Sequence, residues 1–122
     1  MKRALIIEDT EDNMELISFI LQGSGYQTLK AMTGEQGVAM TLLERPDFVI
    51  LDIQLPDIDG YEVLKRIRSS EANGDIPIIA MTSYAMTGDK ERLLAAGCNG
   101  YIEKPINPRH VIAQIEKVLG EE

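Results

Sequence analysis

The chain has 122 residues, 44% of them hydrophobic, which suits one compact domain spanning residues 1–122 and leaves no room for an effector domain. Its formal net charge of -8 repels phosphate backbones and anionic membrane surfaces, which argues against nucleic acid as a direct partner. No stretch suits a signal peptide or a membrane span, and the single cysteine, Cys98, cannot form an internal disulfide. A cytoplasmic protein without membrane insertion is therefore expected.

Short apolar runs alternate with amphipathic segments about twice as long, a pattern that predicts repeated strand–helix units. Three runs lack polar alternation, as strands covered on both faces should, and we expect them at the centre of a sheet: residues 4–7, 48–51 and 76–81. Two further runs mix polar and apolar residues and are expected at the edges: residues 27–31 and 100–103.

Five helices are expected after these strands, and several have recognisable ends. Asp12 with Glu15 resembles a capping box for the first helix, and Thr33 with Gln36 resembles one for the second. Asn107 is expected to cap the fifth helix, over residues 108–119. The expected buried faces contain Met14, Ile17, Ile20 and Leu21 in the first helix, Val38, Leu42 and Leu43 in the second, Val63, Leu64 and Ile67 in the third, and Val111, Ile112, Ile115, Val118 and Leu119 in the fifth.

The fourth helix, around residues 90–96, is poorly marked because Gly88 lies at its start. Five strands alternating with five helices require right-handed crossovers, and the edge and centre assignments favour the strand order 2-1-3-4-5. This is the flavodoxin-like, doubly wound α/β fold with a parallel sheet. In that order the chain changes direction between the first and third strands, so a ligand is expected beyond their carboxyl ends.

Polar residues follow the strands at this edge of the predicted sheet: Glu8 and Asp9 after the first, Asp52 after the third, Thr82 after the fourth and Lys104 after the fifth. Asp52 is the most informative, because an unpaired carboxylate at the end of so apolar a strand would be costly. At an effective dielectric constant near 20, two unit charges about 4 Å apart repel by roughly 4 kcal/mol, so three converging carboxylates call for a cation. Hard oxygen ligands suit Mg²⁺, and one divalent ion plus Lys104 would balance the three charges.

Phosphoryl transfer to a carboxylate requires an in-line nucleophile, a metal ion and donors for the phosphoryl oxygens. Asp52, the expected cation, Thr82 and Lys104 supply these parts. The sequence therefore predicts that Asp52 accepts a phosphoryl group.

Several segments together resemble the receiver domain of bacterial two-component response regulators: Glu8-Asp9, residues 51–60, Met81-Thr82-Ser83, and Tyr101 followed by Lys104-Pro105. The resemblance covers the whole chain, with the motifs in the family's order and at its spacing, so it is more specific than any one motif.

This resemblance implies a magnesium-dependent phosphoacceptor site. Asp52 would be the phosphoacceptor, and Asp9, Asp52 and the backbone carbonyl of Gln54 would bind Mg²⁺ or Mn²⁺. Glu8, which stands where an aspartate is commoner in the family, would help through water. Gln54 and Tyr84 occupy positions that vary in the family and tune the lifetime of the phosphoryl group.

The resemblance also implies a switch. Thr82 and Lys104 would contact the phosphoryl group, Tyr101 would swing inward as Thr82 shifts, and Pro105 would follow a cis peptide bond. A histidine kinase or a histidine phosphotransfer protein would be the donor. The face formed by the fourth helix, fifth strand and fifth helix would then rearrange, moving Tyr101 and the loop 84–88 and changing the binding of an unknown downstream protein.

The sequence is also compatible with other interpretations. Glu8 and Asp9 could cap the helix that follows them, Lys104 could be a solvated surface lysine, and Tyr101 could cover the edge of the sheet. An aspartate-nucleophile phosphohydrolase is the enzyme alternative, which Gln54 disfavours because such enzymes resemble one another in carrying a second aspartate at that position. A degenerate receiver acting as a scaffold is the third alternative. The leading hypothesis is a signalling domain that assists its own phosphorylation and dephosphorylation, not an enzyme acting on a separate substrate.

Overall fold

The computed structural model describes residues 2–70, 74–83 and 87–120, so Tyr84 and the first three residues of the predicted loop 84–88 lie outside the described residues. The described residues form one parallel sheet of the predicted order, β2-β1-β3-β4-β5. Its strands are β1 (Arg3–Ile7), β2 (Gln27–Ala31), β3 (Phe48–Asp52), β4 (Ile78–Thr82) and β5 (Gly100–Glu103). The helices are α1 (Glu11–Gly23), α2 (Gly34–Glu44), α3 (Gly60–Arg68), α4 (Thr87–Ala95) and α5 (Val111–Leu119).

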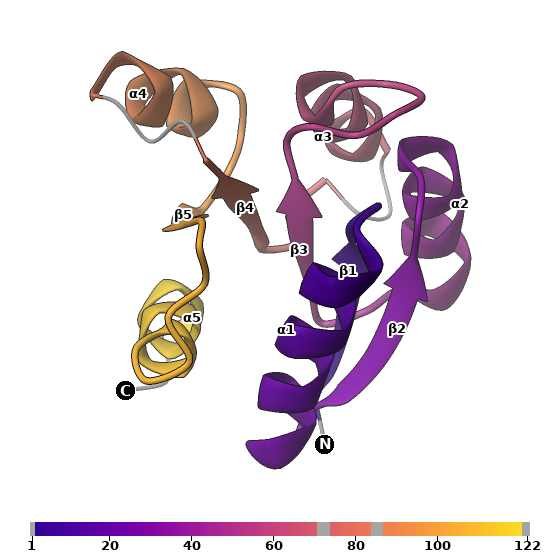
Figure 1. Ribbon diagram of the computed structural model, residues 1–122. Helices are drawn as coiled ribbons and strands as arrows, with labels where there is room; N and C mark the ends of the chain where they lie inside the picture. The colour runs from indigo at the N-terminus through magenta and orange to yellow at the C-terminus, as the bar shows by residue number, and fades with distance from the viewer. Residues whose placement is uncertain (1, 71–73, 84–86, 121–122) are drawn as a thin grey trace.

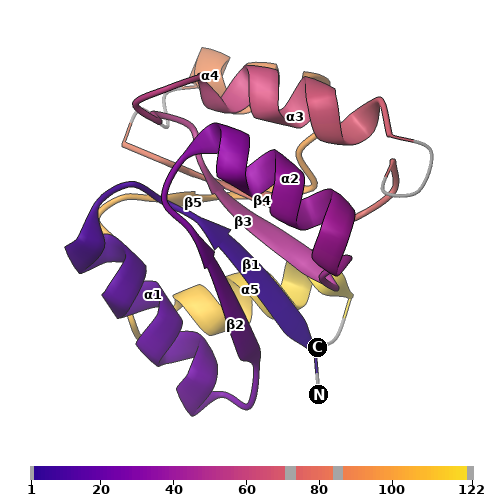
Figure 2. The same cartoon turned by 90° about the vertical axis from the view of Figure 1, so that its right-hand side faces the viewer.

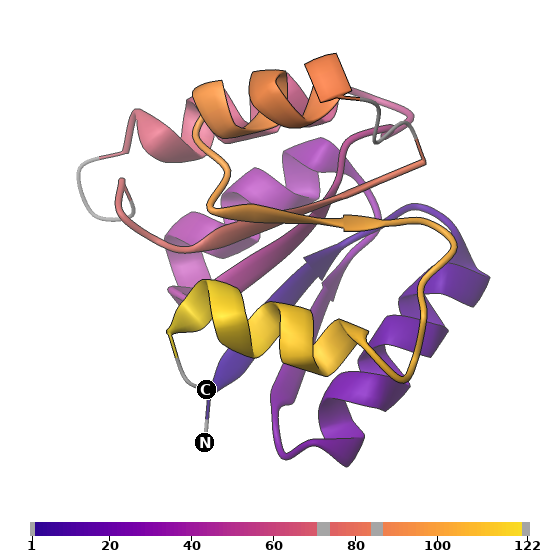
Figure 3. The same ribbon diagram turned by 90° about the vertical axis from the view of Figure 1, so that its left-hand side faces the viewer.

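Helices cover both faces of this sheet (Figure 1). Figure 2 shows α2, α3 and α4 above the sheet and α1 and α5 below it, and Figure 3 shows the same layers from the opposite side. Alternate strand residues enter the two layers: Ile6 and Ile50 pack with residues of α1 and α5, whereas Leu5 and Leu51 pack with residues of α2, α3 and α4. The three central strands are almost fully buried for this reason, as their unbroken apolar sequences predict.

The ends of the helices follow the capping predictions only in part. Thr33 caps α2 as predicted, because its hydroxyl accepts a hydrogen bond from the N–H of Gln36 at 3.1 Å. The predicted capping box at Asp12 and Glu15 is wrong, because α1 already begins at Glu11 and places Asp12 inside its first turn. There the acidic side chain interacts favourably with the positive end of the helix dipole.

The start predicted for the fifth helix is also wrong. Asn107 does cap a turn, since its side-chain oxygen accepts a hydrogen bond from the N–H of Arg109 at 3.0 Å. However, residues 108–110 form a separate turn, and α5 begins only at Val111.

The buried face of α2 differs most from its prediction. Leu42 and Leu43 are 44% and 79% exposed, and the helix instead rests on the sheet through small residues that include Gly37 and Thr41. A Cβ atom at Gly37 would lie 2.5 Å from Cδ1 of Ile7, so only glycine allows this close approach. The prediction was therefore wrong for Leu42 and Leu43, whereas Val38 is partly buried against the core as predicted.

Candidate functional site

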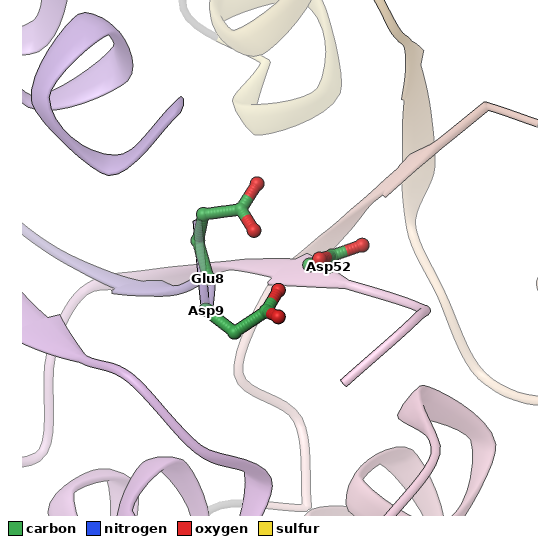
Figure 4. A group of neighbouring side chains, drawn as sticks. All are labelled: Glu8, Asp9 and Asp52. Carbon is green, nitrogen blue, oxygen red and sulfur yellow. The ribbon is translucent and has the colours of Figure 1, made fainter. Parts of the chain in front are cut away.

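The structure brings three of the predicted site residues together at the carboxyl edge of the sheet. β1 and β3 are neighbours, so Glu8 and Asp9, which follow β1, lie beside Asp52, the last residue of β3. Ligand oxygens of the three carboxylates lie within 4.8 Å of one another. Figure 4 shows that the side chains of Glu8 and Asp9 leave the chain in different directions and that both carboxylates turn toward Asp52.

Two of these carboxylates are withdrawn from solvent and one is not. Glu8 is 0% exposed and Asp52 is 2% exposed, whereas Asp9 is the most exposed of the three. Glu8 Oε2 accepts a hydrogen bond from the N–H of Thr10 at 3.2 Å, and Asp52 Oδ1 accepts one from the N–H of Gln54 at 3.1 Å. The open side of the cluster is therefore the side that carries Asp9.

Lys104 is the cation that faces the buried pair. Its Nζ lies 2.9 Å from Glu8 Oε1 and 3.3 Å from Asp52 Oδ1, and its side chain is only 14% exposed. The backbone N–H of Lys104 donates to the carbonyl of Thr82 at 2.9 Å, which extends the β4–β5 ladder and directs the lysine to this edge. Lys104 is thus part of the cluster and not a solvated surface lysine, and the peptide bond that joins it to Pro105 is cis, as expected.

The charges of the cluster are not balanced by this lysine alone. Burial raises the pKa of Asp52, and the neighbouring Glu8 raises it further, to about 7. Burial also acts to raise the pKa of Glu8, but the contacts with Asp52 and Lys104 outweigh it and lower that pKa. Without a metal ion, Asp52 therefore retains a proton at pH values where an ordinary aspartate has lost it.

These residues fit a magnesium ion. Glu8 Oε1 is fully buried and accepts no hydrogen bond of good geometry, so its proximity to Lys104 is an ion-pair contact that leaves the oxygen available to a further cation or an ordered water. The donors are carboxylate oxygens, which Mg²⁺ prefers, and the exposed Asp9 leaves room for retained waters.

Thr82 and Tyr101 lie on the two strands beyond Asp52. Thr82 is 4% exposed and ends β4, beside Lys104. Tyr101 lies on β5, partly buried against the apolar layer of α2, α3 and α4, with Lys90 Nζ 5.0 Å from the centre of its ring. Lys90 also forms an ion pair with Glu103 at 3.3 Å. Tyr101 therefore contacts α4 through Lys90.

A groove of about 470 Å³ lies next to Tyr101. Its lining comes from β5, the segment that follows it and α5, and consists of Tyr101, Glu103, Pro105, Asn107, His110 and Gln114. The groove therefore lies on the β5 and α5 part of the face at which partner binding is expected.

Two aspartates in the loop between β3 and α3 have roles that the sequence analysis missed. Asp59 caps α3 by accepting a hydrogen bond from the N–H of Glu62 at 3.0 Å, and the spacing of these two residues is a recognisable capping signal. Asp57 accepts hydrogen bonds from the backbone of Gly34 and Glu35 at the start of α2. No local pattern predicts that contact, because the partners are more than 20 residues away in the sequence.

Comparison with known proteins agrees with this geometry. The sequence model of the family described as the response regulator receiver domain matches residues 4–116. The chain belongs to this family. Similar proteins include the polar-differentiation response regulator DivK of Brucella anthropi, which is 39% identical over 120 residues, 98% of each chain. As a receiver, the chain is a signalling domain of two-component systems, as the resemblance in its sequence indicated.

Solved receiver structures are similar in fold. A putative response regulator from Chloroflexus aurantiacus superposes with a TM-score of 0.92 at 30% identity, over 98% of each chain. The receiver domain of a sensor histidine kinase from Pseudomonas aeruginosa, at 33% identity, has a TM-score of 0.89 over 98% of each chain. That structure holds a magnesium ion coordinated in its active site cleft, the kind of ion that the acidic cluster suits here. In the described part of this receiver, none of the helices combines the length and apolar character needed to cross a bilayer.

Proposed function

We propose that this receiver takes a phosphoryl group from a phosphohistidine of a kinase or histidine phosphotransfer protein onto the carboxylate of Asp52. The observation that carries the proposal is the placement of Asp52, which is 2% exposed at the end of β3, beside two further carboxylates and 3.3 Å from Lys104. Burial and neighbouring charge of this kind typically occur at functional sites. A degenerate receiver serving as a scaffold would have no need of this arrangement.

The proposed transfer is a displacement at phosphorus. A carboxylate oxygen of Asp52 forms a bond to phosphorus while the bond between phosphorus and the donor imidazole nitrogen breaks, and the electron pair remains on that nitrogen. Only the deprotonated form of Asp52 can attack, so its retained proton must first be lost. Lys104 favours that loss, because its ammonium stabilises the charged carboxylate.

Asp9, Asp52 and the backbone carbonyl of Gln54 would hold Mg²⁺, or Mn²⁺, with Glu8 acting through water. When bound, the ion would offset negative charge on the carboxylates and on the phosphoryl oxygens. Thr82 would donate its hydroxyl to one phosphoryl oxygen, and Lys104 would leave its carboxylate partners to pair with another. The same residues would assist both phosphorylation and hydrolysis of the phosphoryl group.

The test is incubation with acetyl phosphate and Mg²⁺, followed by measurement of intact mass. The wild type is expected to gain the mass of one phosphoryl group, and Asp52→Asn is expected to gain none, because an amide is not a nucleophile. Asp59→Asn is the matched control: it changes another aspartate of the same region, keeps a capping side chain and should still be modified. An unmodified wild type, or equal modification of wild type and Asp52→Asn, would refute the proposal. An adduct that persists would also separate a signalling domain from a fast phosphohydrolase.

The phosphoryl group would then act as a switch of partner binding. Moving a two-state equilibrium from 1:99 to 99:1 takes roughly 5.5 kcal/mol, and a hydrogen bond to a charged group contributes about 1.5–3 kcal/mol. New bonds from Thr82 and Lys104 would supply much of this difference. Because the backbone of Lys104 is bonded to Thr82, movement of either residue would reach β5, Tyr101 and the groove beside it.

Hydrogen exchange before and after phosphorylation tests this part of the proposal. The rates are expected to change in the amides of α4, β5 and α5, since Tyr101 and its contact with Lys90 would be displaced. β2, at the far edge of the sheet, should exchange as before. Asp52→Asn treated in the same way controls for direct effects of acetyl phosphate. Unchanged exchange on the α4–β5–α5 face of a fully phosphorylated sample would contradict the proposed route.

A further inference from the structure

The side chain of Asp57 joins the loop between β3 and α3 to the start of α2. Its Oδ1 accepts a hydrogen bond from the N–H of Gly34 and its Oδ2 accepts one from the N–H of Glu35, both at 2.8 Å. These two amides have no partner within the helix, and the helix dipole adds to their attraction for a carboxylate. The N–H of Glu35 contributes most to a lowering of the pKa of Asp57 to about 2, so this side chain is ionised at neutral pH.

The loop anchored by Asp57 is the loop that carries Gln54. Its other end is closed by a hydrogen bond from the N–H of Gly60 to the carbonyl of Ile53 at 2.8 Å. A Cβ atom at Gly60 would lie 2.6 Å from the Cα of Ile53, so the two ends of the loop meet at backbone distance. Within the loop, the N–H of Gln54 is bonded to Asp52.

The loop also contacts α2 through Ile58. A Cβ atom at Gly34 would lie 2.5 Å from Cγ1 of Ile58, which shows how closely this side chain approaches the start of the helix. The backbone around Gln54 is therefore held at two places: where the loop closes between Ile53 and Gly60, and where Asp57 and Ile58 contact α2. Unlike the apolar contact of Ile58, the two hydrogen bonds of Asp57 with α2 are directional.

We propose that Asp57 is a positioning residue for the metal site: by fixing the loop to the start of α2, it sets where the backbone carbonyl of Gln54 lies. This inference rests on the proposed role of that carbonyl as a magnesium ligand. Partners that orient metal ligands without touching the metal typically contribute 10–100-fold to affinity. The same contact also caps α2. The positioning role and the capping role can be separated experimentally, because Thr33 caps the same helix but does not belong to the loop.

The experiment measures Mg²⁺ binding to the full chain by titration calorimetry, with the melting temperature of each variant recorded beside it. Asp57→Ala is expected to weaken Mg²⁺ binding roughly tenfold. Thr33→Ala is the matched control, because it removes a side-chain cap from the same helix and leaves the loop attached. It should lower the melting temperature while keeping the dissociation constant for Mg²⁺ within about twofold of the wild type.

Asp57→Asn distinguishes position from charge. Asparagine removes the charge but keeps one acceptor oxygen, so it should weaken Mg²⁺ binding less than alanine does. If Asp57→Ala and Asp57→Asn weaken Mg²⁺ binding equally and the loss disappears at high salt, the effect is one of charge and the inference is overturned. Equal weakening of Mg²⁺ binding by Asp57→Ala and Thr33→Ala would overturn it as well. If the variants bind Mg²⁺ like the wild type, only the inference fails. If the wild type itself does not bind Mg²⁺, the proposed function fails first and the inference falls with it.

Discussion

Replacement of Lys104 by methionine is expected to slow the phosphorylation of Asp52 by acetyl phosphate by roughly 10²–10³-fold. Methionine keeps most of the length of the side chain but removes the ammonium that lies 2.9 Å from Glu8 and 3.3 Å from Asp52. In the proposed reaction that ammonium pairs with a phosphoryl oxygen, and its loss removes stabilisation where negative charge is transferred. The rate is measured at saturating Mg²⁺ by intact mass over time.

Lys90→Met is the matched control for this substitution. Lys90 also pairs with a glutamate, Glu103 at 3.3 Å, but on the α4–β5 face and away from the carboxylate cluster. It should keep the rate within a few-fold of the wild type. Mg²⁺ binding to Lys104→Met should be retained or tightened, because a cation that competes for the same carboxylates is gone. A Lys104→Met variant that is phosphorylated as fast as the wild type would remove the lysine from the proposed mechanism.

The site was predictable because its residues stand at strand ends. In a parallel sheet the carboxyl ends of neighbouring strands share one edge, so the order of the strands was enough to place Glu8 and Asp9 beside Asp52. The order itself followed from the uninterrupted apolar sequences of β1, β3 and β4. Lys104 required one further step, since only its position after β5 distinguishes it from a surface lysine.

The contacts that the sequence did not predict are those between distant residues or those that depend on close packing. α2 packs on the sheet through Gly37 and Thr41, whereas the sequence predicted that its leucines would be buried there. Asp57 bonds to an element more than 20 residues before it, and no individual role was predicted for it from the sequence. Such tertiary contacts depend on how closely two elements pack against each other. The hydrophobic periodicity of a sequence carries no information about that distance.

Without Mg²⁺, Asp52→Asn is expected to be more stable than the wild type at pH 8, by roughly 2–4 kcal/mol. The pKa of Asp52 is raised from 3.8 to about 7 in the folded chain, first by burial and then by Glu8. Between these values the folded chain holds a proton that the unfolded chain has lost, so the stability of the wild type falls as the pH rises from about 4 to about 7. Asparagine has no such proton, and the variant lacks this fall.

The measurement is the free energy of unfolding by urea for both proteins from pH 4 to pH 8, with EDTA present. Taking the difference between the two curves cancels the contributions of groups that titrate alike in both proteins. The lowered pKa of Glu8 acts in the opposite sense, but only below about its ordinary value of 4.5, at the acid end of the range in which Asp52 contributes. The difference in the free energy of unfolding should be small at pH 4, grow toward pH 7 and then level off.

Added Mg²⁺ should reduce or reverse this difference, because a cation that binds the wild-type carboxylates stabilises the folded chain by mass action. A difference that is constant across this range would mean that the cluster is not destabilised by its own charge, and the physical reason for a cation at this edge of the sheet would be lost.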